Sequence, residues 1–549
     1  MAATQPVWSR VDEAQHTDFI IQLSHGTYPL ADRTTIDPET LDVMKSTGVY
    51  RFESPGTYPT PDAADIGPPP AAMSARANAV WMSRHLWQLS YESAQTPGYY
   101  VLMVPIWWVA DRLGGAMTAI FVLRLINALL IALLAPMAVL VAWRMAPGRP
   151  EVIGLAGVFG VLLPGLTLNM TRVGNDALAA VIGGAAVLLS IVWAGTRWNA
   201  RRAVLLGVLL GAGVLVKLTL LGLAPAIAVA MLWPAMRPPL PRRILLLALT
   251  GAVVLLFVGV WFAINLHLYG VPVPSARTNR LSIVPPQSFD LRYVPFTIAF
   301  FAVSYWSGEP IGALPFAAAF VVLGSLIVLI AAIGLFRARS LGGPVVVALT
   351  CAAGMAAVAL LLPATAAFQF AGPGRYEYPA LPAVAALTGL GLGAALAMTF
   401  TRRALAAMYG VGAGALLVGA ALGVGGESIP TSAPPPSAAT TVASSGTVGQ
   451  FTITIDEVGH RSGTWIHVTA TNAGADEAEW NPAPVVDGTS ADYGRSTHLP
   501  GDIDPGAAAS GWIFIPIETQ PGQSVTVRFR DVAVDNYQTV ADVVLQLSV

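Results

Sequence analysis

About ten long apolar runs constrain the fold of this chain more than any other feature. A helix needs about 20 apolar residues to cross the hydrocarbon core of a bilayer. Charged residues make up only 11% of the sequence, against about 25% in an average soluble domain. We therefore predict a multi-pass α-helical membrane protein. The runs lie near residues 115–143, 152–170, 175–194, 203–217, 219–235, 243–266, 311–336, 344–363, 380–400 and 404–425.

A shorter apolar run at 99–110, YYVLMVPIWWVA, precedes the first long one. It ends in Asp111 and Arg112 and is rich in aromatic residues, which favour the headgroup region of a membrane. We predict an interfacial or re-entrant segment here. Residues 1–18 lack the apolar core of a signal peptide. We expect that a first span is missing from this sequence, or else that the N-terminus is translocated unaided.

The remaining composition argues against several functions. The net charge is −1 and there is no basic tract, so nucleic acid is not an expected partner. The single cysteine, Cys351, excludes an intrachain disulfide and a cysteine-cluster metal site. The sequence holds no P-loop, dinucleotide fingerprint, H-E-x-x-H or G-x-S-x-G motif. Nucleotide chemistry of the soluble type is therefore not expected.

Arginine placement predicts the sidedness of the membrane body, because cytoplasmic loops are enriched in Lys and Arg. Every second connection between the runs carries arginines, and the connections between them carry few. This alternation places residues 1–114, 171–174, 267–310, 364–379 and everything after 425 outside a plasma membrane. The arginines are Arg144 and Arg149, then Arg197, Arg201 and Arg202, then Arg237, Arg242 and Arg243, then Arg337 and Arg339, then Arg402 and Arg403.

The chain after the last apolar run changes character. Residues 430–446 are rich in Pro, Ser, Thr and Ala, which is typical of a linker. Short runs that alternate polar and apolar residues follow, separated by Gly, Asn, Asp and Pro, and predict a small antiparallel β-sandwich. We divide the chain into an extracytoplasmic loop region with interfacial helices (1–114), a transmembrane body (115–425), a linker (426–446) and an extracytoplasmic β-sandwich domain (447–549).

The first candidate for chemistry is the segment Asp12-Glu13-Ala14-Gln15-His16, followed by the turn Gly26–Pro29. On a helix, Asp12 and His16 share one face. A carboxylate at the membrane surface can act as a general base toward an acceptor hydroxyl. The simpler interpretation is a solvated helix start with Asp12 as its N-cap.

Two further outer segments carry polar residues beside a span. Gln95 and Tyr99 lie in Tyr91–Tyr100, where a Pro-Gly turn and tyrosines also suit simple anchoring in the headgroup region. Arg172, Asn175 and Asp176 lie in the short outer turn NMTRVGND, which also reads as turn and capping chemistry.

Two cations stand out against their apolar surroundings. Lys217 lies between two apolar runs, where it either meets an anionic partner such as a lipid phosphate or extends to the interface. Arg375 and Tyr376 begin a late span on the outer side, where arginine is unexpected. An anionic ligand such as phosphate accounts for Arg375, and a salt bridge to Glu377 is the alternative.

Together these segments resemble the GT-C class of polytopic membrane glycosyltransferases, in particular the clan of protein mannosyltransferases and aminoarabinose transferases. The resemblance covers about residues 8–400. It consists of short motifs in family order: Asp12–His16, Gly26–Pro29, Gln95–Tyr100, Leu123–Leu129 (LRLINAL), Asn175–Leu178, Lys217–Thr219, Trp261–Gly270 and Arg375–Pro379. The segment Gln95–Tyr100 departs from the family pattern, because a His is absent and Gly98 replaces a Pro.

The resemblance implies transfer of a sugar from a polyprenyl-phosphate donor to a cell-envelope glycan or protein on the extracytoplasmic face. In that reading Asp12 is the catalytic base, and Glu13 assists it. The sugar and the acceptor would meet His16, Gln95, Tyr99, Asn175, Asp176 and Tyr376, and the lipid phosphate would meet Lys217, Arg375 and Arg172. No metal and no cofactor is expected.

Two other functions compete with this hypothesis. A non-catalytic assembly or glycan-binding protein could keep the same membrane body, and the β-sandwich makes that alternative credible. A lipid or polysaccharide transporter is the third hypothesis. Transporters often show related halves and charges at mid-membrane, whereas here the charges gather at the outer face and no duplication is visible.

Overall fold

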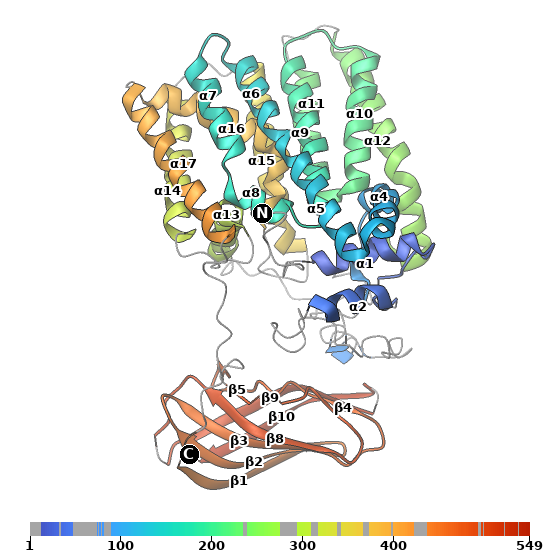
Figure 1. Cartoon of the computed structure of the whole chain (residues 1–549), viewed down its shortest axis with the longest axis vertical. Coiled ribbons are helices and arrows are strands. Elements are labelled where there is room, and N and C mark those ends of the chain that lie inside the picture. The colour runs from blue at the N-terminus through green and yellow to red at the C-terminus, as the bar shows by residue number, and fades with distance from the viewer. Residues whose placement is uncertain are drawn as a thin grey trace.

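We analysed a computed structural model of the chain (Figure 1). It describes residues 12–31, 34–47, 74, 76–77, 80–81, 89–233, 239–274, 294–308, 317–337, 342–365, 373–396, 399–421, 436, 438–491, 496–497, 499–520, 522–535 and 537–548. Several residues considered above lie outside this part, including Arg237, Arg339 and most of the predicted outer loop 267–310.

The apolar runs fold as helices that stand side by side in one membrane body (Figure 1). Among the described residues, 7 helical stretches are long and apolar enough to cross a membrane: Ala116–Met145, Pro150–Met170, Asp176–Trp193, Leu240–Tyr269, Ala317–Arg337, Gly343–Leu361 and Gly374–Ala395. The prediction of a multi-pass membrane protein is therefore confirmed. The run at 203–217 forms a helix of 17 residues. The run at 219–235 forms a 3₁₀ helix that continues into a short α-helix.

The helices of the body follow the order of the runs. Their bounds are α4 Gly98–Gly114, α5 Ala116–Ala132, α6 Leu134–Met145, α7 Pro150–Val161, α8 Pro164–Met170, α9 Asp176–Trp193, α10 Ala200–Val216, η5 Leu218–Leu223, α11 Ala224–Leu232, α12 Leu240–Tyr269, α13 Val294–Ser307, α14 Ala317–Arg337, α15 Gly343–Thr365, η8 Gly374–Ala380, α16 Leu381–Ala395 and α17 Thr399–Ala421.

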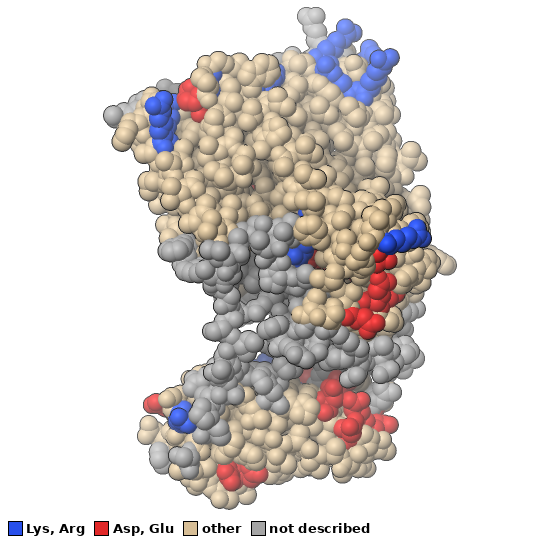
Figure 2. Space-filling view, viewed as in Figure 1, with Lys and Arg blue, Asp and Glu red and all other residues tan. Residues whose placement is uncertain are grey.

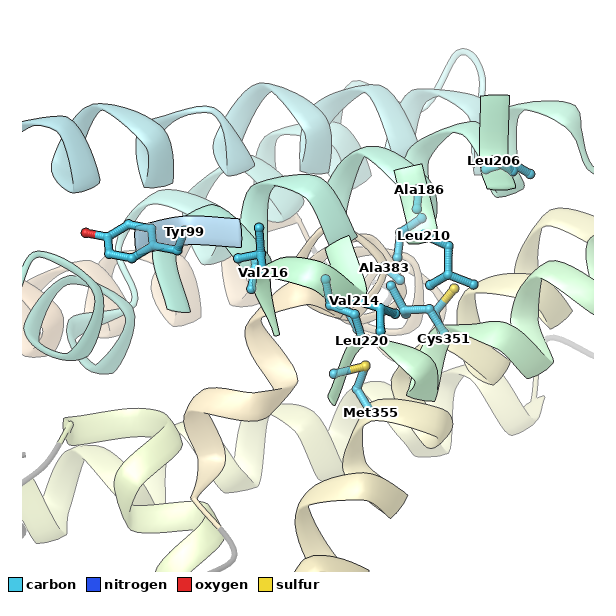
Figure 3. Packing of buried hydrophobic residues seen from close by; sticks show 14 of the residues in the cluster. Tyr99, Ala186, Leu206, Leu210, Val214, Val216, Leu220, Cys351, Met355 and Ala383 are labelled. Carbon is cyan, nitrogen blue, oxygen red and sulfur yellow. The ribbon is translucent and has the colours of Figure 1, made fainter. Parts of the chain in front are cut away.

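Small residues let these helices approach closely. A Cβ added to Gly391 would stand 2.1 Å from the backbone oxygen of Ala331, so α14 and α16 touch through their backbones. Such close contacts replace the hydrophobic driving force, which is absent between helices in lipid. A second packed layer joins α10, η5, α15 and α16, where Leu210, Leu220 and Cys351 are buried together (Figure 3). This layer fixes the end of α10, from which Lys217 extends.

A compact outer segment covers one end of the body. It contains α1 Glu13–Ser24, α2 Pro38–Thr47 and the 3₁₀ helix η4 Tyr91–Ala94, which leads directly into α4. An isolated bridge between Thr35 and Leu89 and a hydrogen bond from Ser90 N–H to the Thr34 oxygen (2.8 Å) connect its distant parts. Most Lys and Arg side chains visible in Figure 2 lie at the opposite end of the body.

The C-terminal region is an antiparallel sandwich, as predicted. One sheet has the order β1-β2-β3-β8 (Ala439–Val448, Phe451–His460, Thr464–Asn472, Ala508–Ile515). The other has the order β6-β5-β9-β4-β7 (Thr489–Ser490, Val485–Val486, Ser524–Val534, Ala478–Glu479, Asp502–Ile503), and β10 (Thr539–Ser548) pairs with β9. Both sheets bury their inner faces in one core, where Ile453 and Phe529 are fully enclosed.

The predicted boundary between linker and β-domain at 446/447 is wrong. Strand β1 begins at Ala439 and pairs with β2 along its length, so the domain starts inside the predicted linker. The sequence of β1, ATTVASSGTV, is rich in the small polar residues that are typical of linkers. Its residues are mostly exposed because β1 is an edge strand, and the apolar alternation that marks the other strands is therefore weak.

Candidate active site

The candidate site lies at the outer end of the membrane body, where α1, η4, α9, Lys217 and η8 meet. Asp12 occupies the N-cap position of α1, as the simpler interpretation expected, but its side chain makes no capping hydrogen bond. Its backbone is left-handed (φ 58°), a conformation that Asp tolerates better than most residues. Its carboxylate instead accepts a short hydrogen bond from the Tyr91 hydroxyl and lies 3.7 Å from Arg375 Nη2.

A buried ion cluster lies beside Asp12. Asp176, the first residue of α9, pairs through Oδ1 with the Lys217 ammonium, and its Oδ2 lies 3.5 Å from Arg375 Nε. Asp12, Arg375, Asp176 and Lys217 thus form one chain of opposite charges. The structure therefore brings together residues that are far apart in the sequence and that the sequence predicted to share a site.

Tyr376 and Asn175 complete the surroundings of Lys217. The Lys217 Nζ atom lies 4.9 Å from the centroid of the Tyr376 ring and donates to Asn175 Oδ1 at 3.2 Å. Asn175 in turn donates to Gln95 Oε1 (2.5 Å) and to the Val216 oxygen (3.2 Å). Lys217 is thus buried among partners and does not extend to the membrane surface.

The alternative of a salt bridge between Arg375 and Glu377 is not among the ion pairs of the described residues. Arg375 turns to Asp12 and Asp176, whereas Glu377 is buried further along η8. Residues two positions apart on a 3₁₀ helix point to different sides, which explains the separation.

Glu13, the second predicted catalytic carboxylate, has a different environment from that of Asp12. It is fully buried and accepts hydrogen bonds from Arg124 Nε (2.7 Å), Arg124 Nη2 (2.5 Å) and the Val173 N–H (2.8 Å). These partners fix the start of α1 against α5 and against the turn before α9. This geometry favours a structural role for Glu13 over the catalytic role that the resemblance implies.

His16 and Glu92 face each other next to Asp12. His16 Nδ1 lies 2.8 Å from the Tyr100 hydroxyl and 3.4 Å from Glu92 Oε2. Burial lowers the pKa of His16 to about 3, against the opposing effect of Asp12, so the imidazole is neutral at physiological pH. Burial, reinforced by the Asp12 charge, raises the pKa of Glu92 well above its usual range.

Asp12, His16 and Glu92 could also hold a divalent ion, because their ligand atoms lie within 4.8 Å of one another. Carboxylate and imidazole groups are ligands for Zn²⁺ and Mn²⁺. That no metal is required remains a prediction.

The two remaining predicted residues line the back of the site. The Tyr99 hydroxyl is within hydrogen-bond distance of Asn127 Nδ2 (3.2 Å) and accepts from the Gly174 N–H (3.4 Å), so it holds the turn before α9. Arg172 is buried, and its charge helps to lower the pKa of His16. Its backbone oxygen accepts from Asn127 Nδ2 (2.6 Å).

Tyr91, Glu92 and Tyr100 also belong to the site, although the sequence did not single them out. Tyr91 and Glu92 lie in the segment interpreted as an anchor, where a carboxyl group just before a Pro-Gly turn was the available signal. Arg124 and Asn127 belong to the LRLINAL motif but were not assigned a role.

Comparisons with known proteins give resemblance in overall arrangement only. No family model matches this sequence, and no curated protein matches it. Among solved structures, ArnT from Cupriavidus metallidurans bound to undecaprenyl phosphate shares 16% identity, with 75% of this chain and 66% of that one covered and a TM-score of 0.39. The archaeal oligosaccharyltransferase AglB from Archaeoglobus fulgidus, in complex with an inhibitory peptide and a dolichol-phosphate, shares 15% identity over 75% of this chain and 55% of that one, with a TM-score of 0.34.

Both proteins are GT-C glycosyltransferases, the class that the order of sequence motifs resembles. The chain spans about two thirds of the length of ArnT and about half of that of AglB. At these low identities and TM-scores no residue role is carried over from either protein.

Proposed function

We propose that the chain is a membrane glycosyltransferase that uses a polyprenyl-phosphate sugar on the extracytoplasmic face. The observation that supports this most directly is the convergence of Asp12, Arg375 and Lys217 at one end of the body. A carboxylate close to two cations matches the demands of a transfer in which a proton leaves an acceptor and a phosphate leaves a donor.

In this proposal Asp12 accepts the proton of an acceptor hydroxyl as its oxygen attacks the anomeric carbon. The new glycosidic bond forms while the bond from that carbon to the phosphate oxygen breaks. Lys217 and Arg375 stabilise the negative charge of the departing polyprenyl phosphate. Buried positions strengthen this effect, because the effective dielectric constant is low there.

Asp176 shapes how the donor would bind. Its carboxylate contacts both Lys217 and Arg375. An incoming phosphate must therefore displace the carboxylate from one of these two cations. Arg172, Asn175 and Gln95 lie at the edge of the same cluster and would contact the sugar or the phosphate. In this proposal Glu13 holds the start of α1 in place through its ion pair with Arg124.

Arginine placement supports the outside location of the site. Most Lys and Arg side chains visible in Figure 2 lie at the end of the body far from the β-domain and the outer segment, as expected for a cytoplasmic end. This arrangement supports the proposal that the site and the β-domain lie together on the extracytoplasmic side of a plasma membrane.

The test is a transfer assay in proteoliposomes with a panel of polyprenyl-phosphate sugars and membrane acceptors. Asp12→Asn should lower the rate by at least about 100-fold, as expected for loss of a general base. Asp42→Asn, on the exposed face of α2 in the same outer segment, is the matched control and should keep the wild-type rate. Wild-type activity in Asp12→Asn would refute the assignment of the base.

Binding of the donor lipid is measured separately, as thermal stabilisation by polyprenyl phosphate. Lys217→Gln and Arg375→Gln should each abolish it, whereas Arg112→Gln on the exposed end of α4 should not. Lipid binding without transfer by the wild type, over the whole panel, would favour the non-catalytic alternative.

A further inference from the structure

The β-domain contacts the outer segment directly, at a place that no part of the proposed chemistry uses. Arg76 donates to Asp531 Oδ1 through Nε (3.1 Å) and Nη2 (2.8 Å), and to Asp542 Oδ1 through Nη2 (2.6 Å). Asp542 also accepts from the Asp531 N–H (3.0 Å), so both carboxylates belong to one β9–β10 unit. We call Arg76, Asp531 and Asp542 the clasp.

A small apolar core lies next to the clasp. It combines side chains of the β-domain with side chains from three parts of the outer segment. Its members, which we call the outer cluster, are Ala31, Ala77, Val80, Trp81, Leu89, Ala533 and Tyr537, with Ala94 and Val540 packed against them. Leu89 lies two residues before the short helix η4 and Ala94 is its last residue, so η4 packs against the apolar core that it shares with the β-domain.

The other side of η4 faces the candidate site. Tyr91 donates to Asp12, and Glu92 lies 3.4 Å from His16. A helix of four residues makes few hydrogen bonds of its own and depends on its surroundings for a fixed position. One short helix therefore links the β-domain to the groups around Asp12.

We propose that the β-domain positions η4, and through it Tyr91 and Glu92, around Asp12. The clasp and the outer cluster hold the domain in place, and Arg76 and Tyr537 are positioning residues. The contact between the domain and the helix is independent of the proposed function. Only its effect on sugar transfer rests on that function.

Hydrogen–deuterium exchange on the full-length protein in lipid nanodiscs tests this link without any substrate. The amides of Ser90, Tyr91, Ser93 and Gln95 are hydrogen-bonded in the structure and report on η4. Arg76→Glu should raise their exchange rates about fivefold. Loss of an exposed ion pair changes a local opening equilibrium by at most about that factor. Arg76→Lys keeps the charge but loses the contact through two nitrogens, so it should raise exchange less than Arg76→Glu does.

The matched control is Arg528→Glu, which makes the same change at an exposed position on β9 that the clasp does not include. It should leave exchange in residues 89–95 at the wild-type level. Asp531→Asn opens the clasp from the β-domain side and keeps a residue that tolerates the left-handed backbone at this position (φ 54°). It should raise exchange in the same residues, but less than Arg76→Glu does, because Asp542 still binds Arg76.

The proposal is overturned if Arg76→Glu or Asp531→Asn accelerates exchange at the β9–β10 end while residues 89–95 keep wild-type protection. A rise throughout α1 and α9 as well would show general loosening, and that also contradicts a specific link. In the transfer assay, Arg76→Glu should lower kcat about fivefold with the donor KM unchanged. If the wild type transfers no sugar, the exchange result still decides the structural link.

Discussion

Removal of Arg124 tests the structural role assigned to Glu13. The two side chains are almost completely buried (3% and 0% exposed) and share two hydrogen bonds of 2.7 and 2.5 Å. In Arg124→Met the carboxylate loses both of these hydrogen bonds and retains the one from the Val173 N–H. Leaving a buried charge without its partner costs about 3–5 kcal/mol. We therefore expect Arg124→Met to lower the free energy of unfolding by about that amount.

The double variant Glu13→Gln/Arg124→Met separates pairing from packing. It removes both charges, and the glutamine oxygen can still accept from Val173. We expect it to be more stable than Arg124→Met alone, with a coupling energy of at least about 2 kcal/mol. The assay is reversible unfolding in mixed micelles with increasing SDS, followed by tryptophan fluorescence. Arg403→Met, at an exposed position of α17, should change stability by less than about 0.5 kcal/mol.

Additive single effects in this cycle, or a loss below about 1 kcal/mol in Arg124→Met, would show that the pair does not hold α1. Glu13 would then again be available as a second catalytic carboxylate. Loss of transfer in Glu13→Gln with unchanged stability would point the same way.

Three other predictions concern the site itself. Because the pKa of His16 is lowered to about 3 in the folded state, the unfolded chain binds more protons below its ordinary pKa of about 6.5. Stability should therefore fall as the pH drops from about 6.5 toward 3, by up to about 1.4 kcal/mol per pH unit, and His16→Gln should flatten this dependence in pH-resolved melting curves. Transfer should persist in EDTA, since Asp12 already has partners; loss that Mn²⁺ restores would instead show an ion held by Asp12, His16 and Glu92. Lys217→Gln/Asp176→Asn should melt at a higher temperature than Lys217→Gln, because it does not leave the buried Asp176 charge without the Lys217 ammonium. It should still bind no polyprenyl phosphate, because the Lys217 cation is absent.

The sequence predicted the membrane body well because its signal is physical and local. A run of apolar residues must form a helix in lipid, where no other structure satisfies the backbone. Lys217 and Arg375 were found for a related reason, since a cation in an apolar or outer position requires an explanation. Their common location followed from the predicted sidedness and needed no knowledge of packing.

The missed contacts depend on packing between distant segments. Nothing local in Tyr91-Glu92 indicates that the tyrosine meets Asp12, because the two residues come together only after α4 and α1 have packed. Glu13 was assigned a catalytic role from the sequence for the same reason, because its packing partner was unknown. A carboxylate that neutralises a buried arginine and one that accepts a proton from substrate look alike in a sequence, and only the position of Arg124 separates them.

The resting charge balance around Asp176 has a consequence for selectivity. Because this carboxylate already pairs with both cations, a small soluble anion gains little by entering, since it only exchanges one negative partner for another. A ligand that is also anchored by a long hydrocarbon tail arrives at a high local concentration and adds the free energy of its tail to the exchange. In the proposed enzyme, Asp176 would thus make the site selective for phosphates that are attached to a lipid over soluble phosphates.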